Sequence, residues 1–220
     1  MDFLLKYGEA KYMKPLIDNG SIFMRPLIDY RRMESDKERG DPLEGVIKSK
    51  RFSNGNLKIH TPNTNKATQI AKITSGHIHE SCTSISFLNV FCMYLLSFNE
   101  NTTADIGKLV DKRVYQGFGD TAILIHNPSE FINRLKKCAE SHGYDLLNDK
   151  VNYIKLNQFE GDIGPFKKEA KYSYQNEYRI VVANPDRKGT PLTLNIGPLN
   201  DICSIFEAHK TSELSFTFND

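Results

Sequence analysis

The stretch that most constrains this fold lies late in the chain, from residue 171 to residue 182. Its second half alternates aromatic or β-branched residues with other types, which is the pattern of a β-strand. Side chains of a strand alternate between its two faces. One face is apolar and consists of Tyr178, Ile180 and Val182. The other face is polar and consists of Gln175, Glu177 and Arg179.

This polar face has two interpretations. If the sheet is open to water on that side, Glu177 and Arg179 form an ordinary solvated ion pair. If the sheet is covered on both sides, these groups are too costly to bury unpaired and must line a cleft. The sequence leaves both interpretations open.

Length and composition predict one soluble domain covering residues 1–220. The chain is 39% hydrophobic and has 13 Phe and 10 Tyr, enough for a core without metals or disulfides. Its net charge of +2 gives no global attraction to nucleic acid or to a membrane. The four cysteines have no Cys-x-x-Cys spacing, so we expect reduced core thiols.

No signal sequence or membrane-spanning run is evident, so we expect a cytoplasmic protein, in a bacterium or in a host cell, without a membrane partner. The overall pattern predicts an α+β fold with mostly antiparallel, mixed sheets and a few peripheral helices. The clearest helix runs from Pro128 to Gly143 with Asn127 as its N-cap, and another runs from Glu9 to Asn19. A hairpin is expected around Asn54-Gly55.

Two further segments bear on the site. Residues 78–87 have the composition of strands. The apolar run from Val90 to Leu96 cannot be assigned by its period alone, but it is expected to be buried either way.

Several short motifs are spread over nearly the whole chain. They are Lys6-Tyr7, Gly40-Asp41-Pro42-Leu43-Glu44, Ser84 to Phe87, Asn89 to Tyr94, Phe166-Lys167 and Tyr172 to Arg179. Together they resemble a widespread bacterial and phage family known as a domain of unknown function. The resemblance brings no chemistry with it.

A second set of residues is Arg25, then Thr83-Ser84-Ile85-Ser86, then Gln175-Asn176-Glu177, in that order along the chain. This order resembles ADP-ribosyltransferases of the bacterial-toxin type, which carry an Arg on an early strand, a Ser-Thr-Ser-like strand in the middle and a Gln-x-Glu or Glu-x-Glu on a late strand. The chain departs from that pattern in its Thr-Ser-Ile-Ser element and in placing Arg179 beside Glu177. The resemblance implies an ADP-ribosyltransferase-like fold and no metal, with NAD as the substrate of a transferase or of an NAD glycohydrolase.

The resemblance also assigns roles to individual residues. Cleavage between nicotinamide and ribose passes through an oxocarbenium-like state, which a fixed carboxylate stabilises. Glu177 would supply that carboxylate and Gln175 would orient the acceptor nucleophile. The implied partner is a small nucleotide, or a protein or nucleic-acid acceptor, and the sequence leaves open which. Among the remaining residues, Arg25 would hold the diphosphate. Ser84, with Ser86 in the same element, would orient the ribose or the catalytic carboxylate, and Tyr94, Tyr30 or Tyr174 would stack on nicotinamide or adenine.

Structural explanations compete with these roles. Arg25 could pair with Asp29 or Glu34, Ser84 could be an ordinary strand serine, and the tyrosines could belong to the core. The chain could then be a non-catalytic binding or inhibitor module of a phage or bacterial defence system.

Three other groups of residues have the types found in metal sites. Asp162, Glu169 and Lys171 have the residue types of a metal-dependent nuclease, which is a second alternative to an NAD-using enzyme. His77 and His79 lie on one strand face without an evident third metal ligand. Asp41 and Glu44, with Glu34, could bind a divalent cation, or they could cap a helix and pair with Arg31 and Arg32. We expect Asp41 or Glu44 to bond backbone amides or an arginine, which would fix a loop at the mouth of the cleft.

Overall fold

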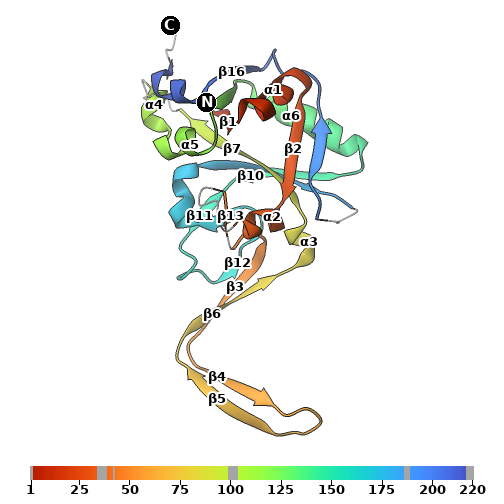
Figure 1. Ribbon diagram of the computed structural model, residues 1–220, viewed down its shortest axis with the longest axis vertical. Helices are drawn as coiled ribbons and strands as arrows, with labels where there is room; N and C mark the ends of the chain where they lie inside the picture. The colour runs from red at the N-terminus through yellow and green to blue at the C-terminus, as the bar shows by residue number, and fades with distance from the viewer. Residues whose placement is uncertain (1, 34–38, 42, 99–103, 186–188, 217–220) are drawn as a thin grey trace.

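An eight-stranded antiparallel sheet forms the centre of the body (Figure 1). The computed structural model describes residues 2–33, 39–41, 43–98, 104–185 and 189–216. The sheet runs in the order β10-β14-β7-β1-β9-β16, and β2, paired with β15, also joins β7. These strands are β1 (Asp2–Gly8), β2 (Ser21–Pro26), β7 (Asn89–Ser97), β9 (Thr121–Ile125), β10 (Asp145–Lys150), β14 (Glu177–Ala183), β15 (Leu192–Asn195) and β16 (Cys203–Glu207).

Two helices, α1 (Ala10–Asn19) and α6 (Pro128–Ser141), cover one face of this sheet. Phe131 and Leu135 of α6 pack into the same core as Ile180 of β14. The predicted start of α6 is confirmed, because the Asn127 side chain accepts a hydrogen bond from the Glu130 amide at 3.1 Å.

Short helices cover the opposite face of the sheet. They pack on Leu5, Tyr94 and Val181, whose neighbours along each strand point to the α1–α6 side. The helices described are α2 (Leu27–Arg32), α3 (Thr83–Ser86), α4 (Ile106–Leu109), α5 (Lys112–Gly117) and the 3-10 helices η1 (Ala170–Gln175) and η2 (Ala208–Glu213). None of these described helices has the length and apolar character needed to cross a membrane.

Smaller strand pairs surround the main sheet. One of them, β11 with β13, is parallel. They are β8 (Ala104–Asp105) with β17 (Ser215–Phe216), β11 (Asn152–Ile154) with β13 (Lys167–Glu169), and β12 (Gly161–Asp162) with β3 (Val46–Phe52). The predicted α+β class with mostly antiparallel sheets is confirmed, and all four cysteines are free thiols.

The late strand predicted from alternation is β14, which lies inside the sheet between β10 and β7. Ile180 and Val182 are fully buried, and Tyr178 is half-buried with its hydroxyl donating to Asn148. Glu177 and Arg179 on the other face are buried as well. The sheet is therefore covered on both sides, which is the condition under which these charges must find partners.

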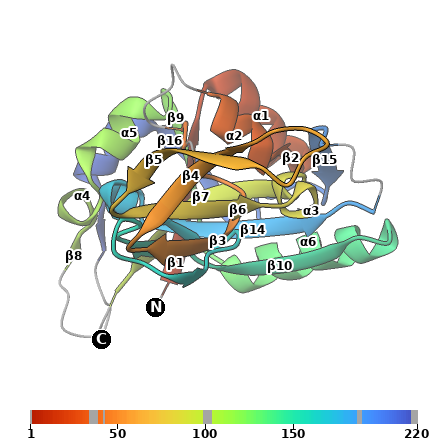
Figure 2. The ribbon, with the colours of Figure 1, turned by 90° about the horizontal axis from the view of Figure 1, so that it is seen from below.

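The hairpin predicted around Asn54-Gly55 is wrong. β3 pairs with β6 (Gly76–Ser81), while β4 (Gly55–His60) pairs with β5 (Ala67–Ile73). The chain turns back at Thr61–Lys66 instead, where the Thr61 amide donates to the Lys66 carbonyl. Residues 46–81 thus form a long arm that projects from the body (Figure 1), with β12 joining β3 at its base and only two strands in its outer part. Figure 2 views the arm from below, with β4 and β5 in front of the body.

The strand predicted for residues 78–87 ends at Ser81, and Thr83–Ser86 form helix α3. Val46 is the last partner of this strand on β3, opposite Ser81. Beyond that point the backbone amides are satisfied locally, since the Ser86 amide donates to the Cys82 carbonyl at 3.0 Å.

Candidate functional site

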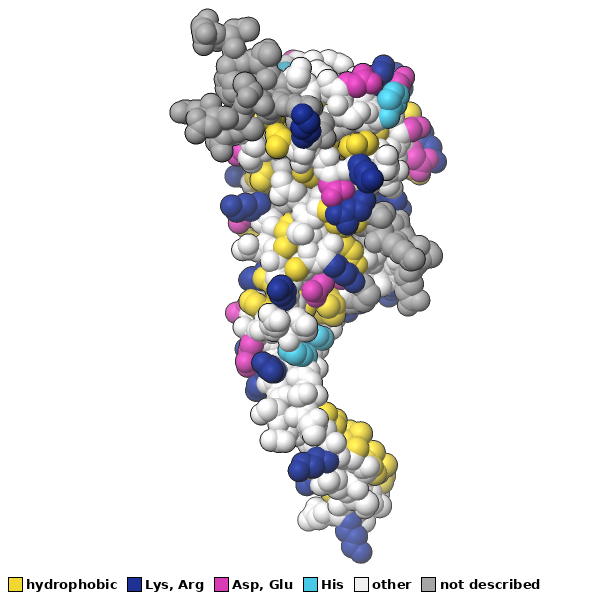
Figure 3. Space-filling model, turned by 90° about the vertical axis from the view of Figure 1, so that its left-hand side faces the viewer, with side chains coloured by type: hydrophobic (Ala, Val, Ile, Leu, Met, Phe, Trp, Pro, Cys, Tyr) yellow, Lys and Arg dark blue, Asp and Glu magenta, His cyan; other side chains and the backbone are white. Residues whose placement is uncertain are grey.

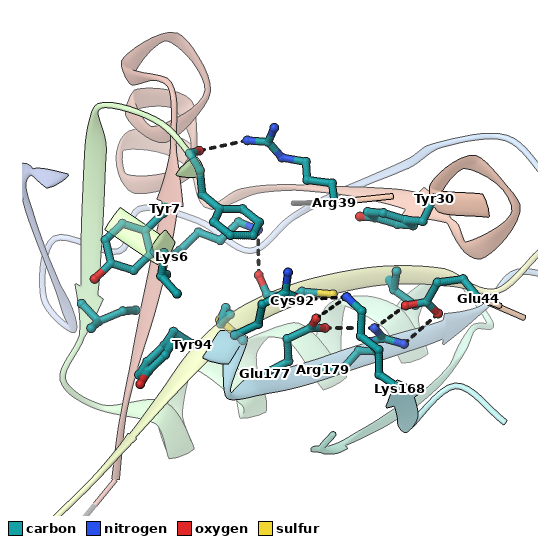
Figure 4. Close-up of a pocket in the computed structure, with 16 residues that line it drawn as sticks. Lys6, Tyr7, Tyr30, Arg39, Glu44, Cys92, Tyr94, Lys168, Glu177 and Arg179 are labelled. Carbon is teal, nitrogen blue, oxygen red and sulfur yellow. Dashed lines mark hydrogen bonds and ion pairs between the residues drawn. The ribbon is translucent and has the colours of Figure 1, made fainter. Parts of the chain in front are cut away.

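A split in the main sheet creates the cavity. β1 pairs with β7 only as far as Leu5, opposite Tyr94, while β2 joins β7 at Arg25, opposite Val90. Between these contacts the Cys92 carbonyl accepts a hydrogen bond from the Lys6 ammonium at 2.7 Å. A cavity of about 120 Å³ lies at this split (Figure 4). The charged residues that line it are Lys6, Arg39, Glu44, Lys168, Glu177 and Arg179.

A buried ion network forms the floor of this cavity (Figure 4). Glu177 Oε1 accepts a hydrogen bond from Lys168 Nζ at 2.7 Å, and Oε2 accepts one from Arg179 Nη2 at 2.9 Å. Arg179 also donates to both oxygens of Glu44, at 3.1 and 2.7 Å. Lys168 donates further to Gln175 Oε1 at 2.7 Å. The network closes because each buried charge has an opposite charge in direct contact.

The electrostatics keep this network ionised. Burial alone would raise the pKa of Glu177, but the charges of Lys168 and Arg179 outweigh burial and hold that pKa well below its usual range. Burial alone would lower the pKa of Lys168, but Glu177 and Glu44 outweigh it and raise the pKa. Glu177 and Lys168 are therefore charged at neutral pH.

The early acidic turn delivers Glu44 to the network. Asp41 Oδ1 accepts a hydrogen bond from the Leu43 amide at 3.0 Å, and Arg31 Nε donates to the Glu44 carbonyl at 2.9 Å. The prediction that Asp41 or Glu44 bonds a backbone amide or an arginine is confirmed for both residues. Pro42 of the same turn lies outside the described residues.

The cavity lining carries more positive than negative charge. Its four cationic residues face two carboxylates, those of Glu44 and Glu177, which leaves an excess of two positive charges when all are ionised. Burial lowers the pKa of Lys6. Arg179 Nε is buried and has no hydrogen-bond partner among the described residues. Such a lining is complementary to an anion that accepts hydrogen bonds.

Aromatic side chains complete the wall. Tyr30, Tyr94 and Phe118 line the cavity, and the Tyr94 hydroxyl donates to the Leu109 carbonyl at 2.9 Å. Burial raises the pKa of Tyr30, so its ring stays neutral. Tyr174 does not line the cavity, and its ring lies 3.7 Å from the Arg113 guanidinium.

The structure brings three of the six predicted site residues together. Gln175, Glu177 and Tyr94 line the cavity, which puts the predicted carboxylate beside the predicted amide. Gln175 reaches it by a route that the sequence did not predict. It ends helix η1 and is not on the strand, because Asn176 adopts a left-handed conformation with φ of 36° before β14 begins.

The other three predicted residues do not line the cavity. Arg25 is exposed on β2, and its guanidinium lies 3.9 Å from Asp29, one of its two expected structural partners. The other expected partner, Glu34, lies outside the described residues. Ser84 and Ser86 lie on α3, and Ser86 is buried there.

Three cationic residues of the cavity were not predicted as site residues. Lys6 stands in the early Lys-Tyr motif, and Lys168 directly follows Phe166-Lys167, so both lay within or beside the resemblance. Arg39 carried no signal beyond its charge; its Nη2 donates to the Phe118 carbonyl at 3.0 Å. On strand β13, Lys168 is buried and Lys167 is not. Which of the two is buried depends on which face of the strand packs against the body.

The remaining groups of residues stay apart from the cavity. Asp162 lies on β12 beside β3, whereas Glu169 lies on β13 beside β11. The rings of His77 and His79 stack with their centroids 6.2 Å apart. Within the described part of the chain, no group of three or more His, Cys, Asp or Glu side chains is placed to hold a metal ion.

Comparison of the chain with family models, with curated proteins and with solved structures finds no match. Function is therefore inferred from the cavity itself.

Proposed function

We propose that the cavity binds the phosphorylated part of a nucleotide, with NAD as the first candidate. The observation that carries this proposal is the lining of four cationic residues and two carboxylates. Phosphate oxygens accept charge-assisted hydrogen bonds from lysine and arginine, and the excess positive charge favours an anion. Tyr30, Tyr94 and Phe118 offer ring faces and edges for a base.

The size of the cavity limits what it encloses. Its volume of about 120 Å³ is below the roughly 300–1,000 Å³ of typical ligand pockets. Only one part of a nucleotide fits inside, so the rest extends from it. In this proposal Lys168 and Arg39 take the phosphate-holding role that the family resemblance gave to Arg25.

The resemblance to ADP-ribosyltransferases supplies the reaction. The bond between the ribose C1′ and the nicotinamide nitrogen breaks, and both of its electrons leave with nicotinamide. The Glu177 carboxylate offsets the positive charge that develops on the ribose. Water or an acceptor then donates an electron pair to C1′ and loses a proton.

A second candidate is a binding module without catalysis. It is favoured by one observation: both oxygens of Glu177 accept hydrogen bonds from cations, Lys168 and Arg179. These cations offset the negative charge that the reaction would need.

Calorimetric titration tests the nucleotide proposal, with NAD, ADP-ribose, pyrophosphate and nicotinamide as probes. We expect ADP-ribose and pyrophosphate to bind and Lys168→Gln to weaken them about tenfold or more, the effect of losing one charged hydrogen bond. Lys167→Gln is the matched control, because this neighbouring lysine donates to the Asp162 carbonyl instead. If the melting temperature shows that Lys168→Gln does not fold, Arg39→Gln replaces it. Absence of binding by the wild type contradicts the proposal.

Nicotinamide release from NAD, with and without cell extract as a source of acceptor, separates the two candidates. An enzyme releases nicotinamide, and Glu177→Gln abolishes turnover while changing NAD affinity little, because the carboxylate acts mainly in the transition state. Binding without release under either condition supports the binding module.

A further inference from the structure

The arm formed by residues 46–81 differs in charge from the rest of the chain. It contains six Lys or Arg residues and a single acidic residue, Glu80, for a net charge of +5. Because the whole chain carries +2, the remaining residues sum to −3. The 34 consecutive residues from Val46 to His79 include no Asp or Glu, although the chain has 27 of them. This segregation of charge is masked in the overall composition.

The distal arm, residues 53–75, is exposed along its whole length apart from half-buried Gly55. Opposed residues of its two strands share a face, with one register shift between Leu57 and Lys58. Lys58 lies opposite Gln69, and Lys72 lies opposite Asn56, which makes one face basic and rich in hydrogen-bond donors. Lys66 extends this positive charge to the tip of the arm.

The opposite face of the distal arm is aliphatic. Leu57 and Ile59 alternate with Lys58 on β4, and their side chains are 50% and 58% exposed. Ile73, opposite Gly55, shares this face, and Figure 3 shows apolar atoms along one side of the arm. Exposed aliphatic groups on a projecting element mark an interaction surface.

We propose that this arm binds double-stranded DNA. Lysine contacts to phosphates dominate the affinity of proteins for DNA, and a carboxylate on such a surface would be repelled. The major groove of B-form DNA admits a two-stranded β-ribbon. A ribbon inside a groove is contacted on both faces, so the lysines reach phosphates while the aliphatic face meets sugars and thymine methyl groups.

Features of the distal arm favour this partner over others. It has no Phe, Tyr or Trp. It therefore lacks the stacking platforms that bind single strands and the aromatic anchors that hold a protein at a lipid interface. The major groove of A-form RNA is too deep and narrow for side chains to read. Association with a second copy would use the aliphatic face but gives no reason for the missing carboxylates.

Fluorescence anisotropy with a labelled DNA duplex of about 30 base pairs tests the proposal on the full chain. We expect the protein to bind the duplex. The logarithm of the observed association constant should fall linearly with the logarithm of the salt concentration between about 50 and 200 mM. The triple substitution Lys58→Gln, Lys66→Gln and Lys72→Gln should weaken binding about tenfold or more. It should also reduce the salt slope by about 2.7, since each phosphate contact contributes about 0.9.

The matched control makes the same change in charge on the body, at exposed Lys136, Lys137 and Lys155. It should leave both the affinity and the slope close to those of the wild type. Leu57→Ser with Ile59→Ser should weaken binding severalfold without changing the slope, because no charge is lost.

Four results would overturn the proposal. The first is absence of duplex binding at about 50 mM salt, and the second is an equal loss of DNA affinity in the arm and body triple variants. The third is tighter binding to an RNA duplex than to a DNA duplex. The fourth is an arm that instead drives dimerisation, measured by sedimentation, or adsorption to anionic lipid vesicles.

Discussion

At the scale of single residues, Glu177 holds two buried cations in place. Glu177→Gln leaves Lys168 and Arg179 with one carboxylate fewer in contact, so we expect the free energy of unfolding at neutral pH to fall by about 3–5 kcal/mol. Urea unfolding measures the loss. Glu160→Gln, at an exposed position, is the control and should change stability by less than about 0.5 kcal/mol. Equal effects of the two substitutions would contradict the role of the network.

The stability difference between the wild type and Glu177→Gln depends on pH. The folded-state pKa of Glu177 lies below its unfolded value of about 4.3, so the unfolded chain binds the proton first as pH falls. The stabilisation is therefore complete above about pH 4.3 and is lost as pH falls through the folded-state pKa. We expect the stability gap between wild type and Glu177→Gln to narrow below about pH 4.3. A gap that stays constant into this acid range, measured by urea unfolding, would contradict the assignment.

Lys6 provides a test on the alkaline side. Burial lowers the pKa of its ammonium, and a bound anion would raise that pKa by adding a negative charge nearby. The affinity for pyrophosphate should then be highest where Lys6 is protonated and should decrease as pH rises through its pKa in the free protein. Titration calorimetry across this pH range measures the effect. Lys6→Met should weaken pyrophosphate binding and flatten the dependence of that affinity on pH. If the variant keeps the wild-type pH dependence, a group other than Lys6 causes it.

At the scale of elements, two helices end at glycines with similar conformations and different surroundings. Gly20 follows α1 with φ of 62°, and Gly143 follows α6 with φ of 71°. A Cβ on Gly20 would lie 2.1 Å from the Gly197 carbonyl oxygen, whereas a Cβ on Gly143 would meet nothing within 4 Å. Position 143 therefore isolates the backbone strain, and position 20 adds a steric overlap.

We expect Gly143→Ala to cost about 1–2 kcal/mol, the strain of a left-handed alanine. Gly20→Ala should cost a further 1–3 kcal/mol or so, because the overlap with Gly197 must also be relieved. Urea unfolding compares the two. Equal losses in the free energy of unfolding for the two variants would mean that the turn at Gly197 shifts without an energetic cost.

At the scale of the whole molecule, we expect the body to fold without the distal arm. Phe52 and Gly76 face each other in register, so an Asn-Gly turn can join them in place of residues 53–75. Because the removed residues are almost all exposed, we expect the melting temperature to change by only a few degrees. Pyrophosphate binding should persist and duplex DNA binding should disappear. A large drop in melting temperature would show that the distal arm supports the body.

The elements whose signals are local could be predicted from the amino-acid sequence. β14 was predictable because alternation separates an apolar face from a polar face, and α6 because its capping residue and the glycine that stops it lie at the helix ends. The same alternation pointed to Glu177, whose carboxylate lies in the cavity, and the acidic turn pointed to Glu44.

Tertiary structure alone decided which distant residues meet. Lys6, Lys168 and Glu177 converge because β1 leaves β7 beyond Leu5, and no local pattern encodes where two strands part. The pairing of β3 with β6, and not with β4, depends on contacts between residues some 30 positions apart. The absence of carboxylates from residues 46–79 is a property of the sequence, but only this long-range pairing turns it into a projecting basic arm.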